Sequence, residues 1–409
     1  PILGALYGPV AFLWIVVGAI FAGAVHDYLT GMISIRHGGA HLPALAAKYL
    51  GKPFSHVVNF FTVLLLLLVG TVFISAPASM INGLLENKAD YLTIITLAIF
   101  GYYIISTVLP IDKIIGKIYP VLGFLLLVSA LGIGISMFFV ENSIPELTFE
   151  NIHPNSLPYY PVIFLTISCG ALSGFHATQS PIISRTVKNE KDGRTIFYGM
   201  MIVEAIIAMI WASAAMTLFN GNGLNGILEN GGAPQVVNEV ATVFLGSIFG
   251  TIAIIGIIIL PITSGDTSFR AARMIIADYL KIGQVALKNR FMIAIPLFVL
   301  AFVLTKIDFQ VLWRYFSWAN QGIAAIALWV ATVYLYQKKA YYMVAMAPAI
   351  FITSVLGSYL FFDPTIGFGL DIVISDIAGV VIASLITVLF FVVMKRNKQP
   401  AEVELNYDK

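Results

Sequence analysis

The sequence is poor in charged residues. Asp, Glu, Lys and Arg make up 11% of its 409 residues, against about 25% in soluble domains. Apolar residues reach 59%, and so few charges cannot cover the surface of a water-soluble domain. The composition therefore excludes a soluble enzyme, a nucleic-acid-binding protein and a disordered protein. The apolar runs are long and unbroken, unlike the alternating segments of a membrane β-barrel, so we expect an all-α polytopic membrane protein.

Cysteine is almost absent as well. The single Cys169 excludes an internal disulfide and a cysteine-rich metal site. Walker A, HExxH and GxSxG motifs are missing, and we find no acid–base or metal-binding constellation at a fixed spacing. We therefore expect no enzymatic activity, no cofactor and no bound metal.

Apolar segments long enough to cross a hydrocarbon core of about 30 Å as helices are abundant, and we predict about eleven membrane spans. They cover residues 9–33, 56–81, 90–109, 114–140, 159–184, 195–219, 240–263, 291–306, 311–336, 341–362 and 374–394. Of the 23 Lys and Arg residues, 20 fall in one set of alternate loops and 3 in the other.

Because cytoplasmic loops carry the excess of basic residues, this division predicts the orientation of the chain. Pro1 lies outside, and the C-terminus lies in the cytoplasm. We expect a transmembrane unit over 1–394 in the plasma (inner) membrane, surrounded by lipid, and a short polar tail over 395–409.

The span 159–184 contains a run of residues that interrupts a helix. After Ala171 come Ser173, Gly174, His176, Thr178, Gln179, Ser180 and Pro181. Lipid cannot satisfy the backbone groups that such residues free, so we expect a broken helix inside protein or beside a water-filled cavity. Transporters bind substrates and ions at such breaks. The alternative is a kinked helix whose hydroxyls bond to the preceding turn.

The span 240–263 ends in a second polar run, ILPITSGDTSFR. Oxygen ligands of the kind that hard cations prefer come from Thr263, Ser264, Asp266 and Thr267, and Gly265 allows a turn. The alternative is a helix cap, in which Asp266 and Ser264 bind free amides as the next helix begins. We expect that helix, within 264–290, to be amphipathic and to lie on the inner face of the membrane.

Ionisable side chains inside predicted spans are costly, about 2.5–3.5 kcal/mol at the bilayer centre on insertion scales. His26, Asp27, His176 and Glu204 are of this kind, and such groups can carry protons. The alternative role is structural pairing between helices. Asn320 and Gln321 also lie deep in a span, where they can bridge helices.

The order of the spans suggests a repeat. The five spans within 159–336 begin with a broken helix that runs inward, whereas only four spans precede them. Secondary transporters are often inverted repeats, so a five-plus-five arrangement predicts one further helix before Pro1 in the native protein.

Four stretches resemble the carbon starvation protein A family: GAIFAGAVHDYLTGMISIRHGG, FLTISCGALSGFHATQSP, ILPITSGDTSFRAARMIIADYL and VLWRYFSWANQGIAAIALW. The similarity runs from about Gly8 to about Trp329. It implies an inner-membrane transporter used when carbon is scarce. The family is associated with peptide uptake, and some members with proton-coupled pyruvate uptake. Its presumed architecture is similar to that of the amino acid–polyamine–organocation transporters, and known members extend upstream of Pro1 with a Gly-rich helix.

The resemblance and the broken helix together indicate a site. Peptides and pyruvate both carry a carboxylate, and a half-helix N-terminus presents N–H groups and a positive dipole to an anion. We expect substrate at Ser173, Gly174, Phe175, His176 and Gln179. We expect coupling to a proton or a sodium ion at Thr263, Ser264, Asp266, Thr267, His26, Asp27 and Glu204. The leading hypothesis is a proton-coupled secondary transporter, and the alternatives are a sodium-coupled symporter and a passive small-solute channel.

Overall fold

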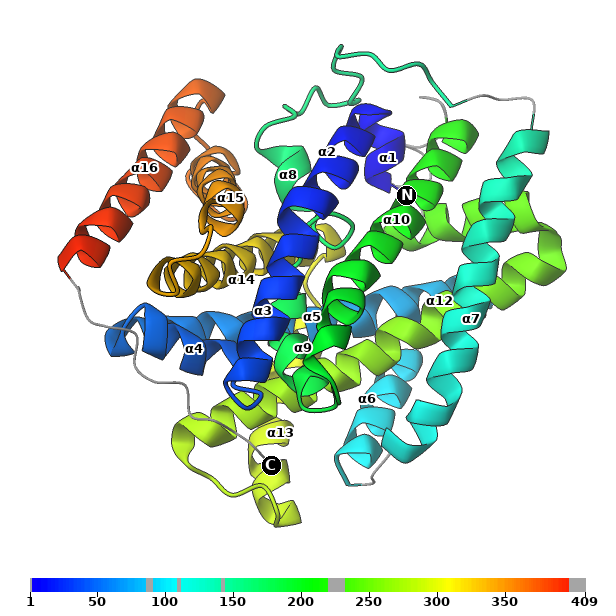
Figure 1. The fold of residues 1–409 in the computed structure, drawn as a ribbon. Helices are drawn as coiled ribbons and strands as arrows, with labels where there is room; N and C mark the ends of the chain where they lie inside the picture. The colour runs from blue at the N-terminus through cyan, green and yellow to red at the C-terminus, as the bar shows by residue number, and fades with distance from the viewer. Residues whose placement is uncertain (1, 86–90, 109–111, 141–143, 220–231, 397–409) are drawn as a thin grey trace.

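The computed structural model describes residues 2–85, 91–108, 112–140, 144–219 and 232–396. Within these ranges every regular element is a helix (Figure 1). Nine segments of the described chain are long and apolar enough to cross a membrane, which confirms an all-α polytopic membrane protein. These segments are 10–36, 52–84, 120–139, 190–219, 234–280, 287–304, 309–337, 343–362 and 372–396. Pro1 and 397–409, which include most of the predicted tail, lie outside the described residues.

Two predicted spans correspond to shorter helices. The span 90–109 contains α6 (Leu92–Val108), an apolar helix of 17 residues. The span 159–184 contains α8 (Val162–Thr166) and α9 (Gly174–Ser184), with a non-helical segment between them. The break was predicted, but its place was not. It lies before Gly174, and the run from Gly174 through Pro181 is helical.

The first predicted span is a composite of three elements. It consists of α2 (Val10–Gly18), a π-helical turn η1 (Ala19–Gly23) and α3 (Ala24–Arg36). A Cβ on Gly23 would overlap the carbonyl oxygen of Ala171, so the loop between α8 and α9 packs directly on the π turn. Such turns inside helices often mark functional sites, and here the turn lies beside the break in the second helix.

The predicted end of a helix near residue 263 is wrong. The long helix α12 runs over Gly232–Leu280 and breaks instead at Gly246, whose φ of 74° and ψ of 176° are non-helical. At about 1.5 Å per residue, the part after Gly246 is about 51 Å long, which is more than a hydrocarbon core of about 30 Å.

The second half of α12 is not the separate helix that the sequence predicts within 264–290, because residues up to Leu280 continue the span. It packs against α5 (Lys52–Leu84) and buries Phe269, Ala271 and Ala272. Gly265 is helical rather than part of a turn, and a Cβ there would overlap the Tyr103 hydroxyl.

The helix α14 (Phe309–Gln337) contacts α3, α5, α9 and α15 (Met343–Phe362). In Figure 1, α14, α15 and α16 (Ile372–Arg396) occupy one side of the molecule. On the other side are α7 (Asp112–Ser136), α10 (Met200–Phe219) and the first part of α12. The smaller or peripheral helices are α1 (Ile2–Tyr7), α4 (Leu42–Tyr49), α13 (Leu287–Leu304) and the short turns η2 (Met137–Phe139), η3 (Glu190–Asp192) and η4 (Arg194–Gly199).

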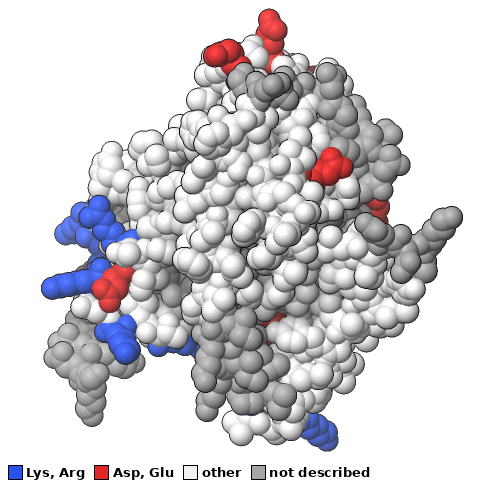
Figure 2. Space-filling view, turned by 90° about the vertical axis from the view of Figure 1, so that its right-hand side faces the viewer, with Lys and Arg blue, Asp and Glu red and all other residues white. Residues whose placement is uncertain are grey.

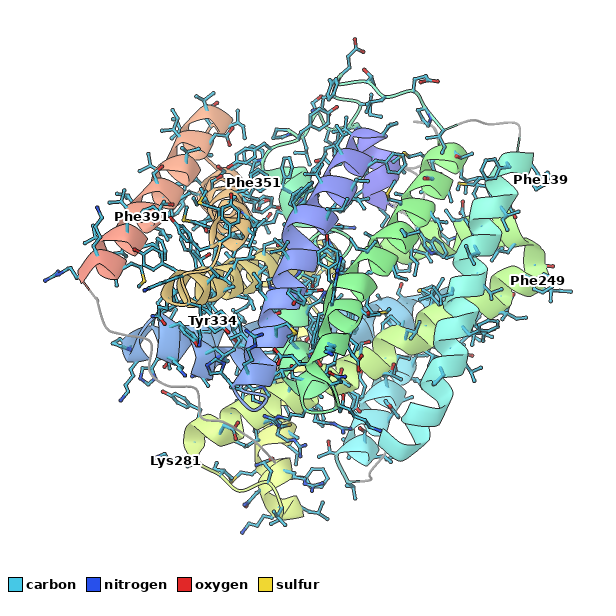
Figure 3. All side chains as sticks on the ribbon, viewed as in Figure 1. Phe139, Phe249, Lys281, Tyr334, Phe351 and Phe391 are labelled. Atoms are coloured by element: carbon cyan, nitrogen blue, oxygen red, sulfur yellow. The ribbon has the colours of Figure 1, made fainter. Side chains whose placement is uncertain are left out.

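The surface has the character of a membrane protein. Phe139 and Phe249 project outward from the side that carries α7 and α12 (Figure 3), with 83% and 68% of their surface exposed. Figure 2 shows acidic side chains mainly in the upper part of the molecule, and basic side chains, with some acidic atoms among them, at the left and lower edges. This separation agrees with a division of the loops between two sides of a membrane.

Candidate functional site

Four ionisable side chains from three helices form one continuous chain of contacts. In α3, His26 Nδ1 lies 2.8 Å from Asp27 Oδ1. The other carboxylate oxygen of Asp27 lies 2.8 Å from His176 Nδ1 in α9, and His176 Nε2 lies 3.4 Å from Glu204 Oε2 in α10. These are the residues that the sequence marks as ionisable groups inside spans, and the structure brings all four together. We refer to them as the relay.

Exposure of these side chains rises steadily along the relay. It is 0% for His26, 8% for Asp27, 24% for His176 and 41% for Glu204. Asp27 contacts both histidines, and His176 has a carboxylate at each ring nitrogen. An imidazole placed in this way can accept a proton at one nitrogen and release one at the other, so the geometry suits proton transfer between the Asp27 and Glu204 carboxylates.

The two interruptions in the helices position the relay. The π turn ends at Gly23, so His26 and Asp27 lie in the first turn of α3. The loop ends at Ser173, so His176 lies in the first turn of α9. Because that loop packs on the π turn, the first turns of the two helices are held next to each other.

The N-terminus of α9 has a protein partner that the sequence analysis did not place in the site. Asn320 Oδ1 in α14 accepts a hydrogen bond from the Phe175 backbone N–H at 2.7 Å and a longer one from Ser173 Oγ at 3.4 Å. Asn320 is fully buried, and among the described residues its Nδ2 has no hydrogen-bond partner. The Phe175 N–H is therefore already used, and any anion at this helix end must bind other groups, among which Asn320 Nδ2 offers a donor.

The remaining predicted substrate residues have different surroundings. Gln179 is half-buried, and its Nε2 donates to Thr178 Oγ1 on the same helix at 3.1 Å. The Phe175 ring packs edge-on against Phe73 of α5, with 6.2 Å between the ring centroids. A Cβ at Gly265 would lie 3.4 Å from the Phe73 Cβ. Phe73 therefore connects the start of α9 to the polar run of α12.

The polar run of α12 is helical, and its carboxylate forms an ion pair. Thr263 Oγ1 donates to the Leu260 carbonyl, and Thr267 Oγ1 donates to the Ser264 carbonyl, both at 2.8 Å. Asp266 accepts from Ser106 of α6 at 2.5 Å and pairs with Arg270, whose Nη2 is 3.1 Å from its Oδ2. Two of the expected oxygen ligands are thus engaged with their own helix, and the carboxylate faces an arginine. The described residues include no cluster of three or more His, Cys, Asp or Glu that could hold a metal ion.

The sequence matches that of known membrane proteins over most of its length. The family model of the carbon starvation protein CstA matches residues 1–93, 78–239 and 227–357. An uncharacterized membrane protein of Haemophilus influenzae is 43% identical over 54% of this chain and 73% of its own. The peptide transporter CstA of Bacillus subtilis is 24% identical over 85% of this chain and 76% of its own. The pyruvate/proton symporter BtsT of Escherichia coli is 26% identical over 54% of this chain and 40% of its own. The chain therefore belongs to the carbon starvation protein CstA family.

Proposed function

We propose that this protein is a proton-coupled secondary transporter that imports small carboxylate-bearing solutes, pyruvate or short peptides, across the inner membrane. The relay is the observation that carries the proposal. A chain of two carboxylates and two imidazoles inside a membrane is costly, and it provides the groups that proton coupling needs. Relatives named as a pyruvate/proton symporter and as peptide transporters support the choice of solute.

The arrangement of α12 favours protons over sodium. A sodium site needs several oxygen atoms that are free to face the ion, whereas Asp266 faces the guanidinium of Arg270. The relay instead contains two histidines, which change charge near neutral pH. We therefore assign coupling to His26, Asp27, His176 and Glu204, and a structural role to Asp266.

This assignment can be tested at Asp266. Replacing Asp266→Asn should lower the apparent melting temperature of the purified protein, because asparagine cannot form the ion pair with the partly buried Arg270 and a hydrogen bond to a charged group is worth about 1.5–3 kcal/mol. The variant that folds should keep most of its proton-driven uptake. Loss of sodium-dependent uptake, with the melting temperature unchanged, would identify Asp266 as a cation ligand instead.

The substrate site is proposed at the start of α9. Ser173, Gly174, Phe175 and His176 lie at an interrupted helix, where the helix dipole attracts a carboxylate. Asn320 Nδ2 adds a buried donor at the same place. Because His176 belongs both to this turn and to the relay, substrate binding and proton binding would meet at a single side chain.

Uptake into proteoliposomes tests the proposal directly. Labelled pyruvate and a labelled dipeptide are each offered to the full-length protein with a proton gradient, a sodium gradient or no gradient. We expect concentrative uptake with the proton gradient alone. Accumulation of substrate with the sodium gradient alone would overturn proton coupling. Uptake that only equilibrates the substrate would favour the passive channel.

A further inference from the structure

A second polar pocket lies away from the relay, at helix ends that the basic loops predict to face the cytoplasm. Its volume is about 370 Å³, which is within the range of about 300–1,000 Å³ that is usual for small-molecule sites. The turn between α3 and α4, the start of α5 and the ends of α9 and α12 form its walls. Its main polar lining residues are His41, Ser55, Asn59, Arg185, Asp278 and Tyr279. Figure 3 marks Lys281, which lies just beyond this end of α12.

The pocket and the candidate substrate site lie at opposite ends of α9. His176 lies in the first turn of α9, whereas Arg185 caps its other end. At about 1.5 Å per residue the two lie roughly 14 Å apart along the helix axis. The pocket is therefore separate from the candidate substrate site.

The Arg185 side chain is held in place at one edge. Its Nε and Nη2 donate to the Gly39 carbonyl at 3.3 and 3.0 Å, and Nη2 is 3.3 Å from His41 Nε2. Gly39 has a φ of +76°, and a Cβ there would lie 2.5 Å from the Arg185 Cγ. Only glycine permits this contact without a shift of the arginine, so the backbone turn is shaped to receive it.

His41 completes the support of the arginine. The ring is 8% exposed. Burial and the positive charge of Arg185 lower the pKa of His41, while Asp278 acts in the opposite direction. This shift favours the neutral ring, whose Nε2 can accept from the guanidinium. Its Nδ1 has no hydrogen-bond partner in the described part of the chain.

An opposite charge lines the same pocket. Asp278 lies near the end of α12 and is exposed. Within the described residues, neither Arg185 nor Asp278 takes part in an ion pair, with each other or with a third group. One pocket thus offers a fixed cationic group and a separate anionic group, both without a charged partner.

We propose that this pocket is a second binding site, on the inner side, for a zwitterionic amino acid or short peptide. The carboxylate would lie on Arg185 and the ammonium group near Asp278. Pyruvate has no ammonium group and should bind here more weakly. The proposal extends the proposed transport function, since a solute that has crossed the membrane would meet this pocket, but its test depends on local occupancy and not on transport.

A cysteine in the pocket can report that occupancy. The natural Cys169 is first replaced (Cys169→Ala), and Asn59→Cys places a thiol in the wall of the pocket. Inside-out vesicles are treated with an impermeant maleimide in the presence of dialanine, N-acetyl-dialanine or pyruvate. We expect dialanine to slow labelling by about tenfold, and the two compounds without an ammonium group to protect far less.

Charge variants test the carboxylate contact at Arg185 and the ammonium contact at Asp278 separately. In this background Asp278→Asn should remove the preference for dialanine over N-acetyl-dialanine, whereas Arg185→Gln should remove protection by both. Lys188→Gln, three residues after Arg185 in the loop that follows α9 and not among the pocket's lining residues, is the matched control and should keep full protection. Labelling that dialanine does not slow, or that all three variants change alike, would overturn the proposal. Uptake by the wild-type protein under a proton gradient is measured in parallel, so that failure of transport is distinguished from failure of this site.

Discussion

Replacing Asp27→Asn should reduce proton-driven concentrative uptake by about 100-fold or more. Asp27 contacts both histidines of the relay, with 2.8 Å to each, and asparagine keeps its shape but not its charge. Two charge-assisted hydrogen bonds are worth about 1.5–3 kcal/mol each, and 1.4 kcal/mol corresponds to a factor of ten. The measurement is accumulation of labelled substrate in proteoliposomes with an imposed proton gradient.

Exchange of labelled for unlabelled substrate, without a gradient, should survive in the same variant. Exchange needs the substrate site and its movement, but no net proton transfer. Asp192→Asn is the matched control, because Asp192 is exposed in η3. If Asp27→Asn concentrates substrate as well as the wild-type protein does, the relay plays no part in coupling. If exchange disappears together with accumulation and the melting temperature falls, the carboxylate is structural.

The members of the relay can be predicted from the sequence because they share one unusual feature. His26, Asp27, His176 and Glu204 are ionisable groups in apolar spans, and the energetic cost of such groups marks each of them separately. The sequence could not show that they touch one another. That contact depends on the π turn and on the loop at Ala171, which bring two helix ends together.

The hydrogen-bond partner of Asn320 cannot be predicted from periodicity or composition. It was recognised as a deep polar residue that can bridge helices, but its partner is the backbone N–H of Phe175. A backbone group has no signature in the sequence. The only signal was Gly174, whose missing side chain leaves room for the backbone of α14 to approach.

At the polar run of α12, the sequence predicts a helix end that the structure does not have. Ser, Thr, Gly and Asp favour caps and turns because their side chains compete with the helix for backbone groups. Inside this protein the same hydroxyls donate to carbonyls of their own helix, as at Thr263 and Thr267. Ser106 and Arg270 satisfy Asp266. Because these partners remove the need for a helix end, the helix continues to Leu280.

Among single methyl additions at the site, Gly174→Ala should cause the largest loss of stability and of transport activity. The new Cβ would overlap the Asn320 carbonyl oxygen and would come within 2.6 Å of the Ala324 backbone nitrogen. These are backbone atoms of a buried helix, which cannot rotate away as a side chain can. The cost should exceed the approximately 1–3 kcal/mol of ordinary overpacking. We expect a lower melting temperature and loss of both exchange and accumulation, because α9 must move away from α14 and carries His176 with it.

Gly322→Ala on the facing helix α14 is the matched control. In the described part of the chain, nothing lies within 4 Å of a Cβ at Gly322, and alanine is favoured over glycine inside a helix by roughly 0.5–1 kcal/mol. This variant should keep its activity and be as stable as the wild-type protein or slightly more stable. Equal behaviour of the two variants would contradict the close packing of α9 on α14. Loss of exchange in Gly174→Ala, at an unchanged melting temperature, would instead place that glycine in direct contact with the substrate.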